Sequence, residues 1–310
     1  MHGVLIVDKP VGPTSHDVVD RVRRVLKSRR VGHTGTLDPF ASGVLPLCIG
    51  KATRLSRFLT GHDKAYEATV RFGFATTTDD LEGEPLGPPR LVSIERPALE
   101  AAARALVGEI LQVPPAFSAK QTAGRRHYDI ARAGGHVERT ACRVRVSKVE
   151  VVSVDGDHAR LDVSCSAGTY VRALARDLGA ALGTGAHLVA LRRTRSGPFA
   201  APHTVPLADL DFERAIQRLV PLEGLMLEMP AIRVGEEGLR ALRHGRSVGR
   251  DLVVDGFPDG APPDRVRVLG PAGELAALAI PRGFGRNVPE LPVQPVFQPD
   301  LVLIDDTVVG

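Results

Sequence analysis

The sequence predicts an α+β fold with mostly antiparallel sheets, because strand-like segments come in runs of unequal length separated by single helices. Its 310 residues, 43% of them hydrophobic, can bury one substantial core and a second, smaller one. No internal repeat or low-complexity tract interrupts this order. We therefore expect two domains, over residues 1–225 and 226–310.

The first elements show both the alternation of apolar residues typical of a strand and the spacing typical of a helix. Residues 3–10, GVLIVDKP, predict a buried strand that ends at a proline. In the following PTSHDVVDRVRRVLK, Thr14 and Asp17 form a capping pair and apolar residues recur at helical spacing, which predicts a helix. The sequence YEATVRFGF alternates, and it predicts a strand with these residues on its buried face: Tyr66, Ala68, Val70, Phe72 and Phe74.

The middle of the chain continues the alternation of helices and strands. Residues 75–90 are polar, acidic and rich in glycine and proline, so we expect a loop. A helix should run from near Glu95 to Gly108. The segments CRVRVSKVEVV and ARLDVSCS predict a hairpin, and residues 169–183 predict a helix with Tyr170 and Arg172 in its first turn.

The C-terminal part carries weaker signals. EEGLRALRHG predicts a short helix, and RVRVLGPAGELAALAI predicts a hairpin that turns at residues 271–273. A tail of about eighty residues is large enough to form a small β-rich module.

Several classes of protein are disfavoured. The three cysteines are widely separated and form no C-x-x-C pair, so neither disulfides nor a zinc site is expected. No apolar run is long enough to span a bilayer, and no signal-peptide pattern is present, so we expect a cytoplasmic protein without membrane contact. P-loop, nucleophile-elbow and zinc-protease motifs are missing, so we expect neither cofactor nor metal.

The positive charge is clustered. The net charge is +4 and the pI is about 9.2, which is compatible with a polyanionic partner and equally with a merely basic surface. Several clusters beside glycine-rich or strand-end segments favour the polyanion. Their members are Arg21, Arg23, Arg24, Lys27, Arg29 and Arg30; Arg125, Arg126 and His127; Arg143 and Arg145; Arg192, Arg193 and Arg195.

One carboxylate stands out in GHTGTLDPFASGVLPL. Pro39 forces Asp38 toward an extended conformation, in a loop too rich in glycine to be helical. A turn aspartate that binds nearby amides is the ordinary interpretation, and a reactive carboxylate is the alternative. Tyr66 is either a core-edge ring or a ring that stacks on a base, and Arg172 is either a surface arginine or the partner of an anion.

The chain resembles the bacterial TruB-type family of tRNA pseudouridine(55) synthases. The resemblance covers nearly the whole chain and follows the family's order through LIVDKPVGPTSHDVV, VGHTGTLDPFASGVLPLCIGKATR, KAYEATVRFG, TTTDDLEGE, EILQVPPAFSA, CSAGTYVRALARDLG and AHLVALRRTRSG. It implies a catalytic domain with the pseudouridine-synthase fold, a mixed and mostly antiparallel sheet flanked by helices, and a small PUA-like C-terminal domain that binds RNA.

The resemblance also implies roles for individual residues. Asp38 matches the catalytic aspartate, Arg172 its partner and Tyr66 the ring that packs against the target base. His33 matches the histidine that helps to open the RNA loop. Lys9, with Pro10, matches a motif that supports the active-site loop. The remaining expected substrate-binding residues are Tyr170, Leu191 and Lys64, and Lys9 and His33 are counted with them.

The sequence departs from the family in two places. Where the family usually reads S-A-L-K, this chain has Ser118, Ala119, Lys120 and Gln121, so no role is transferred to Lys120. A Gly/Pro-rich insertion lies around residues 255–263.

The implied substrate is the T-arm of tRNA, taken by a monomer that needs no cofactor and no protein partner. Two alternatives stay open: a non-catalytic RNA-binding or RNA-folding protein that uses the same pocket, and a synthase that acts on ribosomal RNA.

Overall fold

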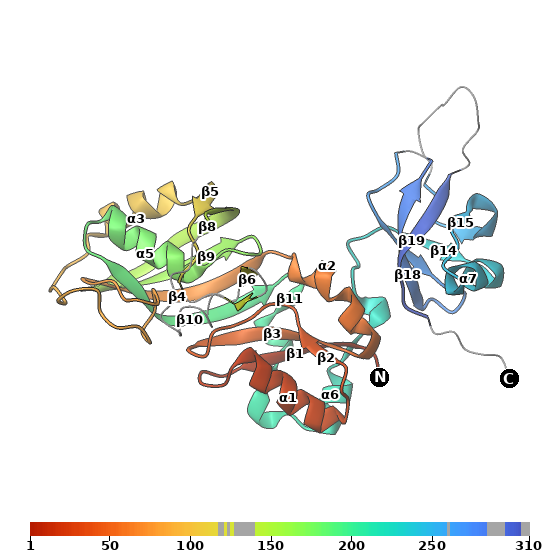
Figure 1. Cartoon of the computed structure of the whole chain (residues 1–310), viewed down its shortest axis with the longest axis horizontal. Helices are drawn as coiled ribbons and strands as arrows, with labels where there is room; N and C mark the ends of the chain where they lie inside the picture. Colours follow the sequence, from red (N-terminus) through yellow and green to blue (C-terminus); the bar gives the residue numbers. More distant parts are fainter. Residues whose placement is uncertain (117–120, 123–124, 127–139, 259–260, 284–294, 305–310) are drawn as a thin grey trace. The chain divides into compact units, whose positions relative to one another are not determined.

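The structure is a computed structural model that describes residues 1–116, 121–122, 125–126, 140–258, 261–283 and 295–304 (Figure 1). By its internal contacts the chain divides into two compact units. The larger unit comprises Leu5–Ile49 and Leu55–Leu219, and the smaller comprises Met1–Val4, Gly50–Arg54 and Val220–Gly310. The domain boundary at residue 226 stays a prediction. Among the described residues, no helix combines the length and the apolar character that crossing a bilayer requires.

The larger unit is built on a sheet whose strands follow the order β12-β1-β3-β10-β4-β9-β8-β5. The pairs from β10 through β4, β9 and β8 to β5 are antiparallel, whereas β10 pairs with β3 and β1 with β12 in parallel. The predicted mixed, mostly antiparallel sheet is thus confirmed. The strands are β1 Gly3–Lys9, β3 Ala41–Ile49, β4 Lys64–Phe72, β5 Gly108–Gln112, β8 Cys142–Asp155, β9 His158–Cys165, β10 Ala186–Ser196 and β12 Val205–Pro206.

Short strands complete the sheet at its margins. β2 pairs with β3, β11 with β10 and β13 with β1, whereas β6 and β7 form a separate two-stranded sheet among the described residues. Their bounds are β2 Val31–His33, β6 Gln121–Thr122, β7 Arg125–Arg126, β11 Phe199–Ala200 and β13 Val220–Pro221.

Helices α3 and α5 pack on the sheet, α3 on β8 and α5 on β10 (Figure 1). At the start of α1 the predicted capping box is present: Asp17 N donates to Thr14 Oγ1 over 3.1 Å, and Thr14 N donates to Asp17 Oδ2 over 2.8 Å. The helices are α1 Ser15–Leu26, α2 Ser56–Thr60, α3 Arg96–Ala105, α5 Val171–Ala181 and α6 Phe212–Gln217.

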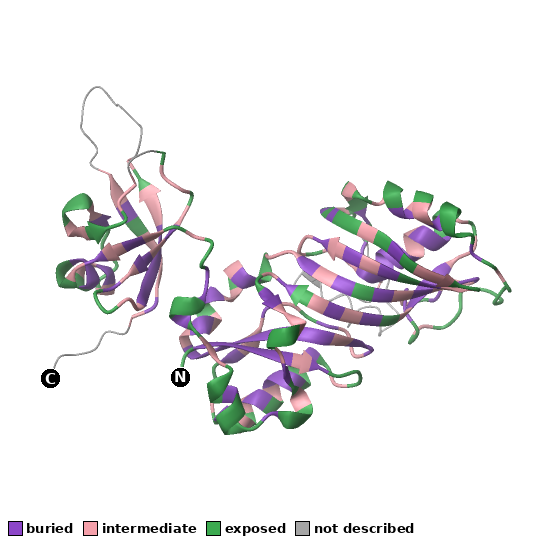
Figure 2. Ribbon diagram, turned by 180° about the vertical axis from the view of Figure 1, so that it is seen from behind, coloured by how far each residue is buried: buried purple, intermediate pink, exposed green. Residues whose placement is uncertain are grey.

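Strand β4 follows the predicted alternation. Its even-numbered residues, from Tyr66 to Phe72, are buried in the main core, and the intervening residues are less buried (Figure 2). The strand begins at Lys64, two residues earlier than the pattern indicates, and it ends at Phe72, so Phe74 lies outside it. Glycine at position 73 has φ +106°, a conformation that ends the strand there.

Three elements differ from the sequence expectation. The helix predicted to reach Gly108 ends at Ala105, because Gly108 begins β5 instead. The helix predicted over residues 169–183 begins at Val171, so Tyr170 is its extended N-cap residue and not part of its first turn. Strand β3 is not predicted at all, because most of its residues are buried on both faces and leave no alternating pattern.

The smaller unit contains a sheet with the order β15-β19-β18-β17-β14-β16 and helix α7, Glu236–Arg243. Its β17–β18 hairpin turns at the predicted place, where Gly273 adopts a positive φ. Its own core gathers residues of β14, α7, β17, β18 and β19. The strands are β14 Ala231–Val234, β15 Val248–Gly249, β16 Val253–Asp255, β17 Val266–Leu269, β18 Leu275–Arg282 and β19 Val296–Val302.

Candidate active site

Two loops meet beside one strand of the large sheet. Strand β3 pairs with β10 from Ala41 and Leu191 onward, and the loop that carries Asp38 immediately precedes β3. Asp80 forms an isolated bridge with Leu188 on the same strand. In the same stretch, between Leu188 and Ala190, the pairing of β10 with β4 has a register shift. The chain thus brings the loops that carry Asp38 and Asp80 to the same strand.

A single glycine makes the approach of β3 to β10 possible. Gly43 has φ +103°, and a Cβ atom at this position would lie 2.2 Å from the carbonyl oxygen of Arg193. Any side chain here would therefore push the two strands apart.

A pocket of about 230 Å³ opens at this place. Six of the eight predicted site residues line it, whereas Lys9 and His33 do not. The predicted residues in its wall are Asp38, Lys64, Tyr66, Tyr170, Arg172 and Leu191, and the wall also contains Thr60, Val171, Arg193 and residues 35–37 and 167–169.

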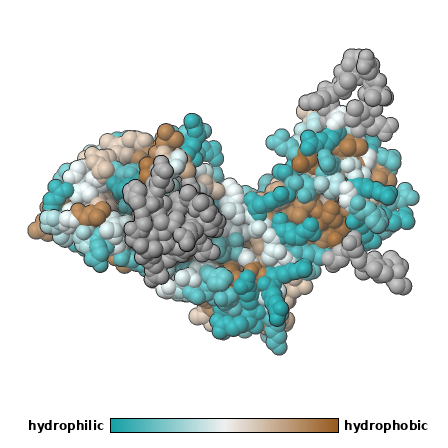
Figure 3. Space-filling view, viewed as in Figure 1, coloured by the Kyte–Doolittle hydropathy of each residue, from teal (hydrophilic) through white to brown (hydrophobic). Residues whose placement is uncertain are grey.

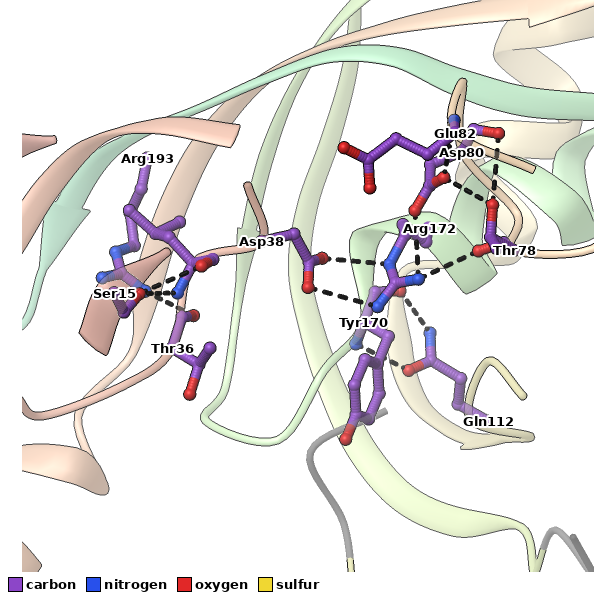
Figure 4. Close-up of polar contacts among 11 residues, drawn as sticks. Ser15, Thr36, Asp38, Thr78, Asp80, Glu82, Gln112, Tyr170, Arg172 and Arg193 are labelled. Carbon is purple, nitrogen blue, oxygen red and sulfur yellow. Dashed lines mark hydrogen bonds and ion pairs between the residues drawn. The ribbon is translucent and has the colours of Figure 1, made fainter. Parts of the chain in front are cut away.

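Asp38 and Arg172 face each other across this pocket (Figure 4). Arg172 Nε lies 3.1 Å from Asp38 Oδ2, and Arg172 Nη2 donates to Asp38 Oδ1 over 3.4 Å. The Asp38 side chain is 36% exposed and the Arg172 side chain only 7%. A ligand in the pocket can therefore reach the carboxylate while the guanidinium orients it from behind.

Arg172 is itself anchored by the loop between β4 and α3. Its Nη1 donates to Thr78 O over 3.0 Å and to Asp80 Oδ2 over 3.1 Å (Figure 4). The other oxygen of Asp80 accepts from the Glu82 amide over 3.0 Å. From the sequence this segment was predicted to be an acidic loop, and the role of Asp80 was missed. Asp80 pairs with an arginine far along the chain, and such a pair leaves no local pattern in the sequence.

Competing effects set the charge of Asp38. Burial raises the pKa of Asp38, and Arg172 opposes this shift because it stabilises the carboxylate. Asp80 raises the pKa of Asp38 further, and the Lys9 ammonium lowers it. The result is a pKa of Asp38 above the usual range, with the Arg172 guanidinium and the Lys9 ammonium limiting the shift.

Lys9 supports the Asp38 loop from beneath. It is fully buried, and its ammonium donates to the carbonyl oxygens of Pro10 at 2.9 Å, Pro39 at 3.3 Å and Ala41 at 2.6 Å. Burial lowers the pKa of Lys9 to about 8, although Asp38 raises it. All three N–H donors of the Lys9 ammonium are directed at these carbonyl groups, so none is free for a substrate. The contacts of Lys9 are therefore those of a residue that supports the loop.

Tyr66 and Arg193 are cross-strand partners on β4 and β10. Tyr66 is 8% exposed, and burial raises the pKa of its phenol while the neighbouring Arg193 lowers it. The ring therefore stays neutral at physiological pH and offers an uncharged wall to the pocket.

Arg193 is a site residue that sequence reasoning missed. It is 1% exposed and donates to Val44 O at 2.7 Å, Gly35 O at 3.1 Å and Thr36 O at 3.4 Å. The sequence placed it in a surface cluster, but strand alternation turns Arg192 outward to Asp8 and Arg193 inward. Counting alternate positions along residues 186–196 could have separated the two.

Two further predicted residues hold the margins of the site. Lys64 donates to the carbonyl oxygens of Thr60 at 2.9 Å and His62 at 2.6 Å, and burial lowers its pKa to about 8, with Arg193 acting in the same direction. His33 lies in β2 outside the pocket wall, and burial lowers its pKa, so its ring is neutral at physiological pH.

Some sequence expectations lie outside the described residues. Ser118, Ala119, Lys120 and the side chains of Gln121, Arg125, Arg126 and His127 are among them. In the part of the chain that the structure describes, no group of three or more His, Cys, Asp or Glu residues could hold a metal ion.

Two family models match consecutive parts of the chain. Residues 23–171 match the model for the TruB family pseudouridylate synthase N-terminal domain, and residues 172–225 match the tRNA pseudouridylate synthase B C-terminal domain. The tRNA pseudouridine synthase B of Ralstonia nicotianae is 44% identical over 89% of this chain and 88% of that protein. This chain belongs to the TruB family of pseudouridylate synthases.

Other relatives agree with this assignment. The tRNA pseudouridine synthase B of Solibacter usitatus is 43% identical over 90% of this chain and 95% of that protein. The crystal structure of the archaeal box H/ACA sRNP Nop10-Cbf5 complex is similar with a TM-score of 0.72 and 28% identity, over 98% of this chain and 86% of that chain. The TruB resemblance and the fold class predicted from the sequence are both confirmed.

Proposed function

We propose that this TruB-family chain isomerises the uridine at position 55 in the T loop of tRNA to pseudouridine. The names of its relatives support tRNA as the substrate. The observation that carries the chemistry is a partly exposed carboxylate, Asp38, fixed by a buried arginine in a pocket walled by Tyr66.

The reaction is an isomerisation that needs little from the protein beyond placement and charge. The N1–C1′ bond breaks, the uracil turns, C5 joins C1′, and the proton lost from C5 is balanced by one gained at N1. Asp38 either attacks C1′ or removes a proton from the sugar, and both roles require an ionised carboxylate. Arg172 maintains that ionised state against the effect of burial, and Asp80 keeps Arg172 in place.

The pocket receives a base that has left its stack. Flipping a uridine out of a folded loop costs on the order of a few kcal/mol. Stacking of the base on the neutral Tyr66 ring offsets about 1–3 kcal/mol of that cost. Tyr170 and Leu191 form the remaining walls, and Lys64 fixes the start of the strand that presents Tyr66.

Exposed basic residues contact the RNA backbone. Among the clusters that the sequence singles out, Arg23, Arg143, Arg145 and Arg192 are each paired with an acid. Lys27, Arg29 and Arg30 are exposed and take part in no ion pair of the described residues. They follow α1, where the surface is hydrophilic (Figure 3), and lead through β2 to His33, whose proposed role is to help open the RNA loop.

The proposed organisation completes this function. Residues 1–225 form the catalytic domain, and residues 226–310 form a PUA-like domain that binds RNA. The enzyme acts in the cytoplasm as a monomer, without a cofactor and without an obligatory protein partner.

The test is to incubate the purified full chain with a T-arm stem-loop and, separately, with a ribosomal RNA fragment, and to map pseudouridine by position. We expect conversion at one uridine of the T loop. Conversion of the ribosomal fragment alone would establish the ribosomal alternative. Binding and refolding of the RNA without any pseudouridine would establish the non-catalytic alternative.

A further inference from the structure

The last residue of β5 forms a two-point contact with the backbone next to the pocket. Gln112 Nε2 donates to Tyr170 O over 3.1 Å, and Tyr170 N donates to Gln112 Oε1 over 2.8 Å (Figure 4). One carboxamide thus satisfies both the amide and the carbonyl of a single residue, much as a neighbouring strand would. Gln112 is 2% exposed and does not line the pocket.

Tyr170, the residue held in this way, marks the start of α5, the helix that carries Arg172. Tyr170 is the N-cap of α5, and no side chain of the helix caps this end. The Tyr170 carbonyl also accepts the first helical hydrogen bond, from Leu174 N over 3.2 Å. Two residues after Tyr170 lies Arg172, whose guanidinium bridges Asp38 and Asp80.

A second contact joins the same strand end to α5. Arg176 Nη2 donates to Val113 O over 2.9 Å, and Arg176 Nη1 pairs with Asp79 over 3.1 Å. With α5 held at Tyr170 and again at Arg176, its first turn cannot shift relative to the end of β5 without breaking these hydrogen bonds. Reactive groups that must meet within a fraction of an ångström gain from such double fixation, since a shift of about 1 Å can cost about a hundredfold in rate.

We propose that Gln112 is a positioning residue for catalysis, which sets the start of α5 and thereby the place of Arg172 relative to Asp38. This inference rests on the proposed function, because the effect is on the synthase reaction. Gln112 touches neither substrate nor reacting atoms and acts only through Tyr170 and Arg172.

Gln112→Glu gives a test that reports on these two hydrogen bonds. The ionised carboxylate keeps the acceptor for Tyr170 N but turns a second acceptor toward Tyr170 O. The protonated carboxyl carries an O–H that can donate to Tyr170 O, so it restores the pair. The rate of the variant relative to wild type should therefore be lowered between about tenfold and about a hundredfold near neutral pH and should recover as pH falls.

The ratio to wild type separates this effect from other titrations. The charged groups on the elements around Gln112 are present in both proteins. They are Glu109 on β5; Arg143, Arg145, Lys148, Glu150 and Asp155 on β8; and Arg172, Arg176 and Asp177 on α5. Single-turnover rates are measured with T-arm RNA from about pH 5.5 to about pH 8.5, together with RNA affinity and thermal melting.

Two variants complete the comparison. Gln112→Met keeps the shape and loses both hydrogen bonds, so its rate should be lowered by a similar factor at every pH while its RNA affinity stays near that of wild type. Glu109→Gln, three residues earlier on β5, changes only an exposed ion pair with Arg143 and should react at the wild-type rate.

The outcomes separate the proposals. A wild-type chain that forms no pseudouridine contradicts the proposed function, whatever the variants do. An active wild type with Gln112→Met at the same single-turnover rate, or with a Gln112→Glu ratio that does not change with pH, overturns the positioning role. Should Gln112→Glu fail to fold at neutral pH, Gln112→Met decides the question through its rate and its RNA affinity.

Discussion

Two buried arginines line opposite walls of the pocket, and their guanidinium groups donate hydrogen bonds to different kinds of acceptor. Arg172 faces carboxylates, Asp38 on one side and Asp80 on the other. Arg193 donates to backbone carbonyl oxygens, at Val44, Gly35 and Thr36. The same side chain thus controls charge in one wall and loop shape in the other.

The two walls therefore have different tasks. The wall formed by α5 favours the ionised form of Asp38, because Arg172 lowers a pKa that burial raises. The wall formed by the loop before β3 determines where Asp38 stands, because Arg193 and Lys9 hold the carbonyl groups on either side of it. Variants of the two arginines should therefore fail in distinguishable ways.

The largest effect is expected for Arg172→Met. Asp38 must be ionised, and loss of the guanidinium raises the pKa of Asp38 further, so the acidic limb of the rate profile should move to higher pH. Near neutral pH the single-turnover rate should fall by about a hundredfold. Arg172→Lys retains the charge and should move the acidic limb less. Unshifted acidic limbs in both variants would contradict the charge role.

A smaller effect on rate is expected for Arg193→Met. Three backbone carbonyls lose a charged donor, so the free energy of unfolding should fall by about 3 kcal/mol, as measured by urea denaturation. The rate of the folded variant should fall by about tenfold with the acidic limb in place. If the limb moved as it does for Arg172→Met, the division of tasks between the walls would be wrong.

The smallest effect is expected outside both walls, in the basic turn after α1. Replacing Arg29 and Arg30 together by glutamine should reduce the slope of log affinity against log salt by about 2 and leave the rate at saturating RNA unchanged. Arg104→Gln, an exposed arginine on α3, is the control and should not change the slope. Equal slopes for wild type and the double variant would remove this turn from the RNA contact.

The two walls also differ in how far the sequence predicts them. The alternation of β4 and the capping box of α1 are local patterns: α1 forms where expected, and β4 has the expected buried face although it ends at Phe72 and not at Phe74. Asp38, Tyr66 and Arg172 were singled out by their residue types and by the family resemblance, and all three line the pocket. The sequence therefore predicts features that depend on a local pattern within one segment, or on motifs that the chain shares with its family.

The supporting contacts could not be predicted in this way. Gln112 meets Tyr170 across 58 positions, and Asp80 meets Arg172 across 92. Arg193 was assigned to a surface cluster because its neighbours are charged, although its place in β10 turns it inward. Such pairs can be predicted only when the order of the strands in the sheet is known. Strand β3 is buried on both faces, so it gives no periodic signal from which to deduce that order.

The most direct test of the account uses Asp38→Asn and a T-arm stem-loop labelled at C5 of the target uracil. RNA affinity should stay within about tenfold of wild type while release of the label is abolished, because the amide can neither attack C1′ nor take a proton from the sugar. Release of the label at the wild-type rate by Asp38→Asn would contradict the claim that this carboxylate reacts.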